Sequence, residues 1–146
     1  MRLGDLLKAK ESRYRFAVTV TPDETVAAAI QKLGEHDRGA LPVCNHKGEL
    51  VGIITERDIV RKLFSHPEGY VKTRIEDVMS KQVVIGSSQD DLSYAVNVMK
   101  QKRIRHLPIV DNQRLIGMIS MRDLLGVQLE ECETKVRYLN DYISRG

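Results

Sequence analysis

The chain has 146 residues, of which 42% are hydrophobic and 29% charged, a composition typical of a globular protein. Its formal net charge of +3 is too small to indicate nucleic-acid binding by itself. The N-terminus lacks an apolar signal segment and no apolar run reaches membrane-spanning length. Cys44 and Cys132 show no partner spacing. We therefore expect a cytoplasmic protein with reduced cysteines.

The predicted elements occur twice, in the same order. Residues 3–7 and 75–79 each form a short amphipathic turn with aspartate at the third position. A strand and then a helix follow each turn. The helix begins after a capping hydroxyl and acidic residues, at 21–26 in the first copy and at 87–92 in the second. Such self-similarity indicates two repeats of one structural unit.

The second half of each repeat is a predicted hairpin. A leucine-proline pair lies in its first strand, at 41–42 and again at 107–108. A polar turn joins this strand to another apolar strand, at 45–48 in the first copy and, one residue shorter, at 111–113 in the second. The two copies otherwise stay in register.

Each hairpin leads into the same seven-residue motif. Residues 52–58 read Gly-Ile-Ile-Thr-Glu-Arg-Asp, and residues 117–123 read Gly-Met-Ile-Ser-Met-Arg-Asp. The apolar run predicts a buried strand, and the hydroxyl followed three residues later by a carboxylate predicts a helix start. A strand that ends at a helix N-terminus presents free N–H groups, which can hold a phosphorylated or hydroxyl-rich ligand.

The repeats predict a domain organisation. We expect a first repeat over 1–68, with a basic and aromatic stretch at 8–16, a second repeat over 69–126, and a helical extension over 127–146. Neither repeat is large enough to bury much apolar surface alone, so we expect one shared core.

Apolar residues in the last segment are spaced alternately by four and three, which is the seam of a two-stranded helix packing. These residues are Leu125, Leu129, Cys132, Val136, Leu139 and Ile143. We expect this helix to pack across a dimer, and packing against its own domain is the alternative.

The leucine-proline strand, the hairpin and the motif Gly-x-Ile-(Thr/Ser)-x-Arg-Asp resemble the cystathionine β-synthase (CBS) domain family. Two copies in tandem resemble its usual unit, the CBS pair or Bateman module, over residues 1 to about 126. The resemblance implies an α+β fold of two β-α-β-β-α units packed sheet to sheet about a pseudo-twofold axis. It also implies a homodimer that binds AMP, ADP, ATP, NAD or S-adenosylmethionine and signals its occupancy to a partner protein.

By motif match, the resemblance implies ribose contacts from Thr55 and Asp58 in the first copy and from Ser120 and Asp123 in the second. An ionised carboxylate can accept hydrogen bonds from both hydroxyls of a vicinal diol. The alternative is a plain capping pair, which uses the same residue types at the same spacing. The two roles can coexist.

Cations near the motif indicate where phosphate would lie. Arg57 and Arg122 fall in a first helical turn, where the helix dipole disfavours a cation, so their recurrence suggests a nearby anion. A surface arginine paired with an acid is the alternative. In the second copy, the resemblance implies phosphate contacts from Arg103, Arg105 and His106; a solvated basic patch is the alternative.

The two clefts are not expected to be equivalent. The first copy has Asp-Arg-Gly-Ala at 37–40, where the second has its basic segment. Either the Asp123 cleft holds the phosphates, or the basic segment reaches across to a ligand whose ribose lies on Asp58.

Adenine would need a slot with apolar walls. Nine candidates are Val18, Val20, Ala40, Leu41, Pro42, Val84, Ile85, Leu107 and Pro108. For most of them we favour the alternative, a plain position in the core. Residues 8–15 could cover a cleft or contact an acidic partner, and a solvated loop is the alternative.

No motif predicts catalysis or a metal site. The four histidines are scattered, with no cysteine or carboxylate at metal-ligand spacing. The sequence also lacks a phosphate-binding glycine loop, a nucleophile elbow and a paired-carboxylate motif. We therefore predict a non-enzymatic sensor. The alternatives are a ligand-free structural or oligomerisation module and a weak nucleic-acid binder acting through 103–105 and the N-terminal basic stretch.

Overall fold

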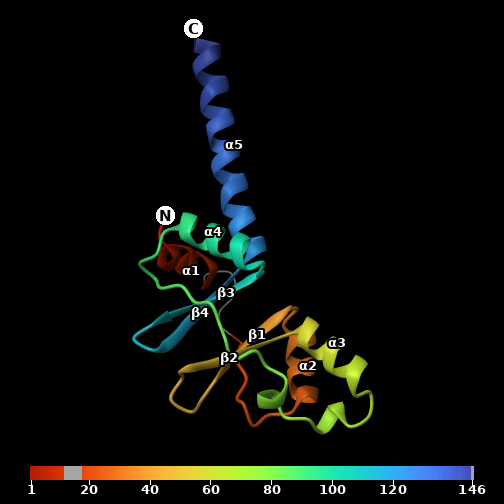
Figure 1. Ribbon diagram of the computed structural model, residues 1–146. Helices are drawn as coiled ribbons and strands as arrows, with labels where there is room; N and C mark the ends of the chain where they lie inside the picture. Colours follow the sequence, from red (N-terminus) through yellow and green to blue (C-terminus); the bar gives the residue numbers. More distant parts are fainter. Residues whose placement is uncertain (12–17, 146) are drawn as a thin grey trace.

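The structure is a computed structural model that describes residues 1–11 and 18–145. It forms two groups of elements, each with a two-stranded antiparallel sheet and flanking helices (Figure 1). In chain order these are α1 (Leu3–Glu11), α2 (Val26–Glu35), β1 (Ala40–Cys44), β2 (Leu50–Thr55), α3 (Glu56–Ser65), the 3-10 turns η1 (Tyr70–Lys72) and η2 (Ile75–Asp77), α4 (Leu92–Lys102), β3 (His106–Asp111), β4 (Arg114–Ser120) and α5 (Met121–Arg145). The predicted α+β class and the two-repeat architecture are confirmed. Of the basic stretch at 8–16, residues 12–16 lie outside the described residues.

The two hairpins are built alike. In the sheet of β1 and β2, Ala40 lies opposite Thr55, and in the sheet of β3 and β4, His106 lies opposite Ser120. Each sheet also has one register shift, at the same repeat position. Both hairpins therefore deliver the hydroxyl of the motif to the end of a strand, directly before a helix.

The strand predicted early in each repeat is shortened to a single parallel bridge. Val20 bridges Val43, with its N–H donating to the carbonyl of Pro42 at 3.1 Å, and Gly86 makes the equivalent bridge beside Pro108. A further bridge, on the N-terminal side of Val20 or Gly86, would need Pro42 or Pro108 to donate a backbone N–H. Proline has no backbone N–H to donate. The leucine-proline pairs therefore stop these ladders after one step.

Each repeat takes a short helix from the other half of the chain. Leu3 of α1 and its two neighbouring leucines are buried in the second repeat, whereas Ile75 of η2 is buried in the first. Backbone hydrogen bonds hold both segments: the N–H of Leu3 donates to the carbonyl of Asp90, and that of Ile75 to the carbonyl of Glu24, each at 2.8 Å. The chain therefore crosses between the repeats twice.

The buried apolar side chains form two clusters, one in each repeat. The first consists of Val20, Val26, Ala29, Leu33, Leu41, Val43, Ile54, Ile59 and Ile75. The second consists of Leu3, Leu6, Leu7, Ala95, Met99, Leu107, Ile109, Ile119 and Leu124. The expectation of one shared core is wrong. Each repeat has its own cluster, and the segment exchanged from the other half of the chain completes it. The sheets still contact each other through an antiparallel bridge between Glu49 and Arg114.

The glycine that begins each motif packs closely against the segment that comes from the other half of the chain. A Cβ atom at Gly117 would stand 2.6 Å from Cδ2 of Leu7, and one at Gly52 would stand 2.6 Å from Sδ of Met79 and 2.9 Å from the carbonyl oxygen of Ser80. At Gly52 the backbone oxygen of Ser80 leaves no room for a side chain, whereas at Gly117 the flexible side chain of Leu7 would have to shift. The first motif therefore needs glycine so that Ser80 can approach β2, and the glycine of the second motif lets Leu7 pack closely on β4.

Helix α5 leaves the rest of the molecule after its first turn (Figure 1). Leu124 is buried in the second cluster, but every described side chain from 128 to 144 is exposed. Packing of this helix on its own domain is therefore ruled out within the described chain. In the part of the chain that the structure describes, no helix combines the length and apolar character needed to cross a membrane.

Replacing Gly52 by alanine should destabilise the fold by about 1–3 kcal/mol through overpacking against Met79 and Ser80. Gly34→Ala is the matched control, because Gly34 lies in helix α2 with nothing within 4 Å of an added Cβ. We expect this control to stabilise the protein by about 0.5–1 kcal/mol. Urea unfolding of the two variants measures both effects, and equal midpoints would contradict the close approach.

Asp111 should make the stability depend on acid. The hydroxyl and the backbone N–H of Ser88 lower the pKa of Asp111 below its ordinary value of 3.8, and the N–H lies 3.1 Å from Oδ1. The ionised carboxylate therefore stabilises the native state above pH 3.8, and this contribution is lost as the pH falls through the lowered pKa. We expect the Tm difference between wild type and Asp111→Asn to shrink below pH 3.8. A constant difference between pH 7 and pH 3 would contradict this role.

Candidate functional site

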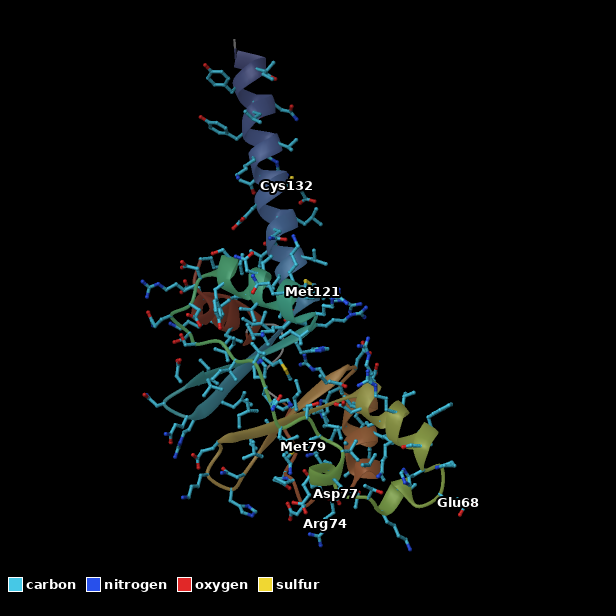
Figure 2. The ribbon with its side chains drawn as sticks, in the orientation of Figure 1. Glu68, Arg74, Asp77, Met79, Met121 and Cys132 are labelled. Atoms are coloured by element: carbon cyan, nitrogen blue, oxygen red, sulfur yellow. The ribbon has the colours of Figure 1, made fainter. Side chains whose placement is uncertain are left out.

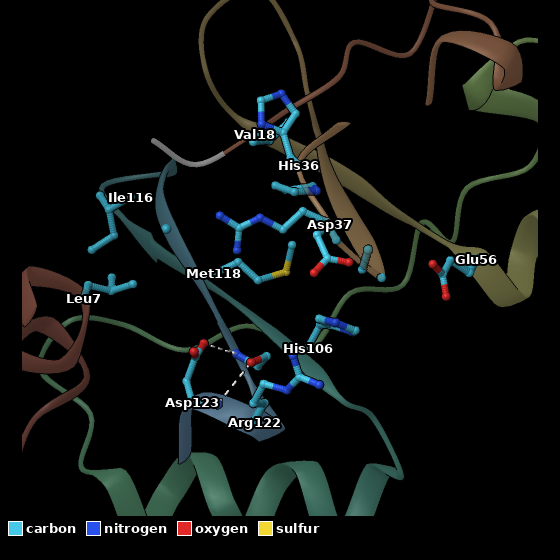
Figure 3. Close-up of a pocket in the computed structure, with 16 residues that line it drawn as sticks. Leu7, Val18, His36, Asp37, Glu56, His106, Ile116, Met118, Arg122 and Asp123 are labelled. Atoms are coloured by element: carbon cyan, nitrogen blue, oxygen red, sulfur yellow. Dashed lines mark hydrogen bonds between the residues drawn. The ribbon is translucent and has the colours of Figure 1, made fainter. Parts of the chain in front are cut away.

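A cavity of about 420 Å³ lies between the two repeats (Figure 3), within the range of small-molecule sites. Both halves of the chain contribute to its wall. The lining residues are Leu7, Val18, His36, Asp37, Arg38, Gly39, Ala40, Pro42, Glu56, His106, Ile116, Gly117, Met118, Ser120, Arg122 and Asp123. In Figure 3, His36 and Asp37 lie across the cavity from Arg122 and Asp123.

The structure brings part of the predicted site together here. Of the predicted polar contacts, Ser120, Asp123, Arg122 and His106 line the cavity, as do the predicted apolar residues Val18, Ala40 and Pro42. The remaining candidates do not line it: Thr55, Arg57, Asp58, Arg103, Arg105, Val20, Leu41, Val84, Ile85, Leu107 and Pro108. Three of these, Val20, Leu41 and Leu107, are at most 1% exposed and belong to the core clusters.

Both motifs form capping boxes at the start of the following helix. Asp123 N–H donates to Ser120 Oγ at 3.1 Å, and Ser120 N–H donates to Oδ2 of Asp123 at 2.8 Å. Thr55 and Asp58 repeat this pair at 3.1 and 2.9 Å. The capping alternative is thus present in both copies. The cap occupies Oδ2 of each aspartate, and a carboxylate has acceptor capacity beyond one such bond.

The first repeat supplies the opposite wall through the turn after α2. Asp37 adopts the left-handed conformation with φ of 51°, which aspartate tolerates better than most residues. Gly39 then accepts a hydrogen bond from the N–H of Glu56 at 3.1 Å, which ties the turn to the start of α3. A Cβ atom at Gly39 would stand 3.5 Å from the ring of His106, so the two repeats come close together at this point.

Sequence reasoning missed several of the lining residues. His36, Asp37, Arg38, Glu56 and Met118 were not assigned to a site, although all five line the cavity. The signal that could have found them is the pseudo-twofold relation between the repeats. It places the turn of one repeat opposite the motif of the other, so the motif of the second repeat faces 36–40.

The charges around the cavity are mixed. Arg38 and Arg122 contribute guanidinium groups, and Asp37, Glu56 and Asp123 contribute carboxylates. Together with the hydroxyl of Ser120 and the apolar wall, this set can recognise a molecule with a hydroxylated, a charged and an apolar part. Across the described residues, no three histidine, cysteine or carboxylate side chains come together as metal ligands would.

Comparisons with known proteins match both repeats. The CBS domain family matches this chain at residues 15–65 and again at 75–130. MK0525, an uncharacterized protein of Methanopyrus kandleri, is 39% identical over 119 residues, which cover 81% of this chain but only 61% of that protein. The crystal structure of the CBS-domain protein ATU1752 from Agrobacterium tumefaciens matches with a TM-score of 0.80 at 31% identity, and covers 88% of this chain and 99% of that one.

A further structure shows the same fold with ligands. It is the CBS domain pair of protein MJ0100 in complex with 5-methylthioadenosine and S-adenosyl-L-methionine. Its TM-score is 0.73 at 22% identity, and the match covers 90% of this chain and 98% of that one. At this identity the likeness is one of fold.

Each capping box should contribute similarly to the stability of the fold. Ser120→Ala and Thr55→Ala each remove the hydroxyl that accepts from a helix N–H, and we expect each to lower the free energy of unfolding by about 1 kcal/mol. Thermal unfolding of the two variants tests this expectation. If Ser120→Ala left the Tm unchanged while Thr55→Ala lowered it, the cap at α5 would not matter for the fold.

Proposed function

Because the chain belongs to the CBS-domain family, as its repeated motif predicted, we propose that it is a regulatory module that binds an adenosine-containing ligand between its two repeats. One observation carries the proposal. The cavity joins the second motif, with Ser120, Arg122 and Asp123, to the turn 36–40 of the first repeat. The structure of protein MJ0100 with 5-methylthioadenosine and S-adenosyl-L-methionine supports a ligand of this class.

We assign the ribose to Asp123 and Ser120. Their capping bonds fix both side chains at the cavity wall before any ligand arrives, and such preorganisation lowers the entropic cost of binding. The carboxylate would accept hydrogen bonds from the two ribose hydroxyls. Asp58 carries the same cap but does not line the cavity. A ligand site at the first motif, beside Asp58, therefore has weaker support.

The charge balance favours some adenosine ligands over others. Two guanidinium groups, of Arg38 and Arg122, face three carboxylates, of Asp37, Glu56 and Asp123. A triphosphate would add more negative charge than this set can compensate. We therefore place AMP, NAD and S-adenosylmethionine ahead of ATP. The proposed phosphate contacts are Arg122 and Arg38, with His106 beside them.

Occupancy would be signalled through the relative placement of the repeats. The cavity has walls from both repeats, so a ligand that binds one arrangement more tightly stabilises that arrangement. We propose that a homodimer transmits this change to a separate regulated protein in the cytoplasm, where the two free cysteines would stay reduced. The proposed chemistry is binding without turnover.

A second candidate function is a structural module without a ligand. The capping boxes favour it, because they give the motif residues a role in the fold alone. On this candidate, no adenosine compound would raise the stability of the protein. A nucleic-acid binder would instead show an affinity that collapses as salt is raised.

Thermal unfolding with added ligand tests the proposal. AMP, ADP, ATP, NAD, NADH and S-adenosylmethionine are compared with GTP, after mass spectrometry has excluded copurified ligand. A ligand that binds only the native state adds about 2.7 kcal/mol at one hundred times its Kd. We expect at least one adenosine compound, and not GTP, to raise the Tm.

Asp123→Ala should abolish that ligand-dependent rise. Asp58→Ala is the matched control, since it breaks an equivalent cap away from the cavity. Both variants should lose similar stability without ligand, but Asp58→Ala should keep the response. If Asp123→Ala also kept it, the ribose assignment would be wrong, and no response in wild type would favour the structural module.

A further inference from the structure

The projecting part of α5 carries an uncovered apolar stripe. The helix is 25 residues long, or about 37 Å. The leucine, valine and isoleucine residues of the stripe, at 125, 129, 136, 139 and 143, are exposed, from 53% for Val136 to 73% for Ile143. In Figure 2, Met121 lies at its base and Cys132 well out along it. Most of the stability of a helix in a protein comes from packing of its apolar face, so we expect another surface to cover this stripe.

The order of residues in the stripe indicates which helix assembly would cover it. Alternate spacing by four and three places Leu129, Val136 and Ile143 at the a positions of a heptad. Leucine occupies the d positions, at 125 and 139, apart from Cys132. Among parallel coiled coils, two β-branched residues at a, with leucine at d, favour two strands over larger bundles.

The flanking charges favour a parallel orientation of the two helices. In a parallel pair in register, Gln128 would face Glu133 of the other copy, and Lys135 would face Asn140, so no like charges meet. An antiparallel pair that matched the apolar layers would bring Lys135 beside Lys135 and Glu133 beside Glu133. Like charges at such positions are destabilising.

We infer that a second copy of this chain covers the stripe, with the two α5 helices parallel and in register. This arrangement rests on the homodimer of the proposed function and specifies its assembly, but it does not depend on any ligand. The two Cys132 side chains then face each other across the helix pair. Both cavities lie at the same end of the pair, beside the base of α5.

Oxidative crosslinking tests the orientation. Copper(II)-phenanthroline is the oxidant. Two Cys132 thiols lose their protons and join in a disulfide, and two Cu(II) ions each accept one electron and become Cu(I). We expect a covalent dimer on a non-reducing gel. The other cysteine, Cys44, is a poor competitor because it is buried and this burial raises the pKa of its thiol.

Two variants control the crosslink. Cys132→Ser should remove the covalent dimer while the protein stays dimeric. Adding Thr134→Cys to Cys132→Ser moves the thiol to the outward f position of the heptad, and this double variant should not crosslink. A dimer in which Cys132 fails to crosslink would overturn the parallel arrangement and leave the homodimer standing.

Sedimentation equilibrium tests the surface itself. Val136→Glu with Leu139→Glu should convert the dimer into a folded monomer, because it places charge in the apolar layers. Arg137→Glu, at an outward position, should leave the dimer intact.

A monomeric wild type would overturn both the inference and the homodimer. A dimer that survives Val136→Glu with Leu139→Glu but is lost in Phe64→Glu would place the interface on α3, where Phe64 is 92% exposed. Ligand-dependent stabilisation is measured separately and fails or succeeds independently of these results.

Discussion

The contact of the two exchanged segments with the motif glycines is the constraint on which this structure depends. Leu7 lies against Gly117, and Met79 and the backbone oxygen of Ser80 lie against Gly52, so closely that an added Cβ would force a shift at both positions. The same contact closes each core, since it brings the buried side chains of α1 and η2 onto the sheets. It also reaches the candidate site, because both Leu7 and Gly117 line the cavity. The contact between Leu7 and Gly117 is therefore part of both the hydrophobic packing and the wall of the candidate site.

The motif residues serve the fold and the proposed site at the same time. Ser120 and Asp123 satisfy N–H groups at the start of α5, and these bonds also hold them at the cavity wall. The same pair in the first repeat, Thr55 and Asp58, caps α3 without lining the cavity. Identical local chemistry thus gives different surroundings in the two repeats. The turn 36–40 of the first repeat lies across the cavity from the second motif.

Local features could be predicted from the sequence, and features that depend on distant parts of the chain could not. The repeats, the hairpins and the helix starts at Thr55 and Ser120 follow from short patterns, and the structure contains them. The early strands were overestimated, because the proline N–H missing from the neighbouring strand limits each ladder to one bridge. The exchange of α1 and η2 left no local signal, since both segments begin with the same short amphipathic pattern. For the same reason, the residues 36–38 were not assigned to the site: they lie far from the second motif in the sequence and meet it only through the pseudo-twofold axis.

The exchange of segments sets a limit on how this chain could be divided. A cut in the connection between α3 and η2 would give an N-terminal fragment that carries α1 but lacks Ile75 of its own core. The C-terminal fragment would carry η2 and lack the three leucines that close its core. Neither fragment holds a complete hydrophobic cluster, so the two would have to recombine in order to fold.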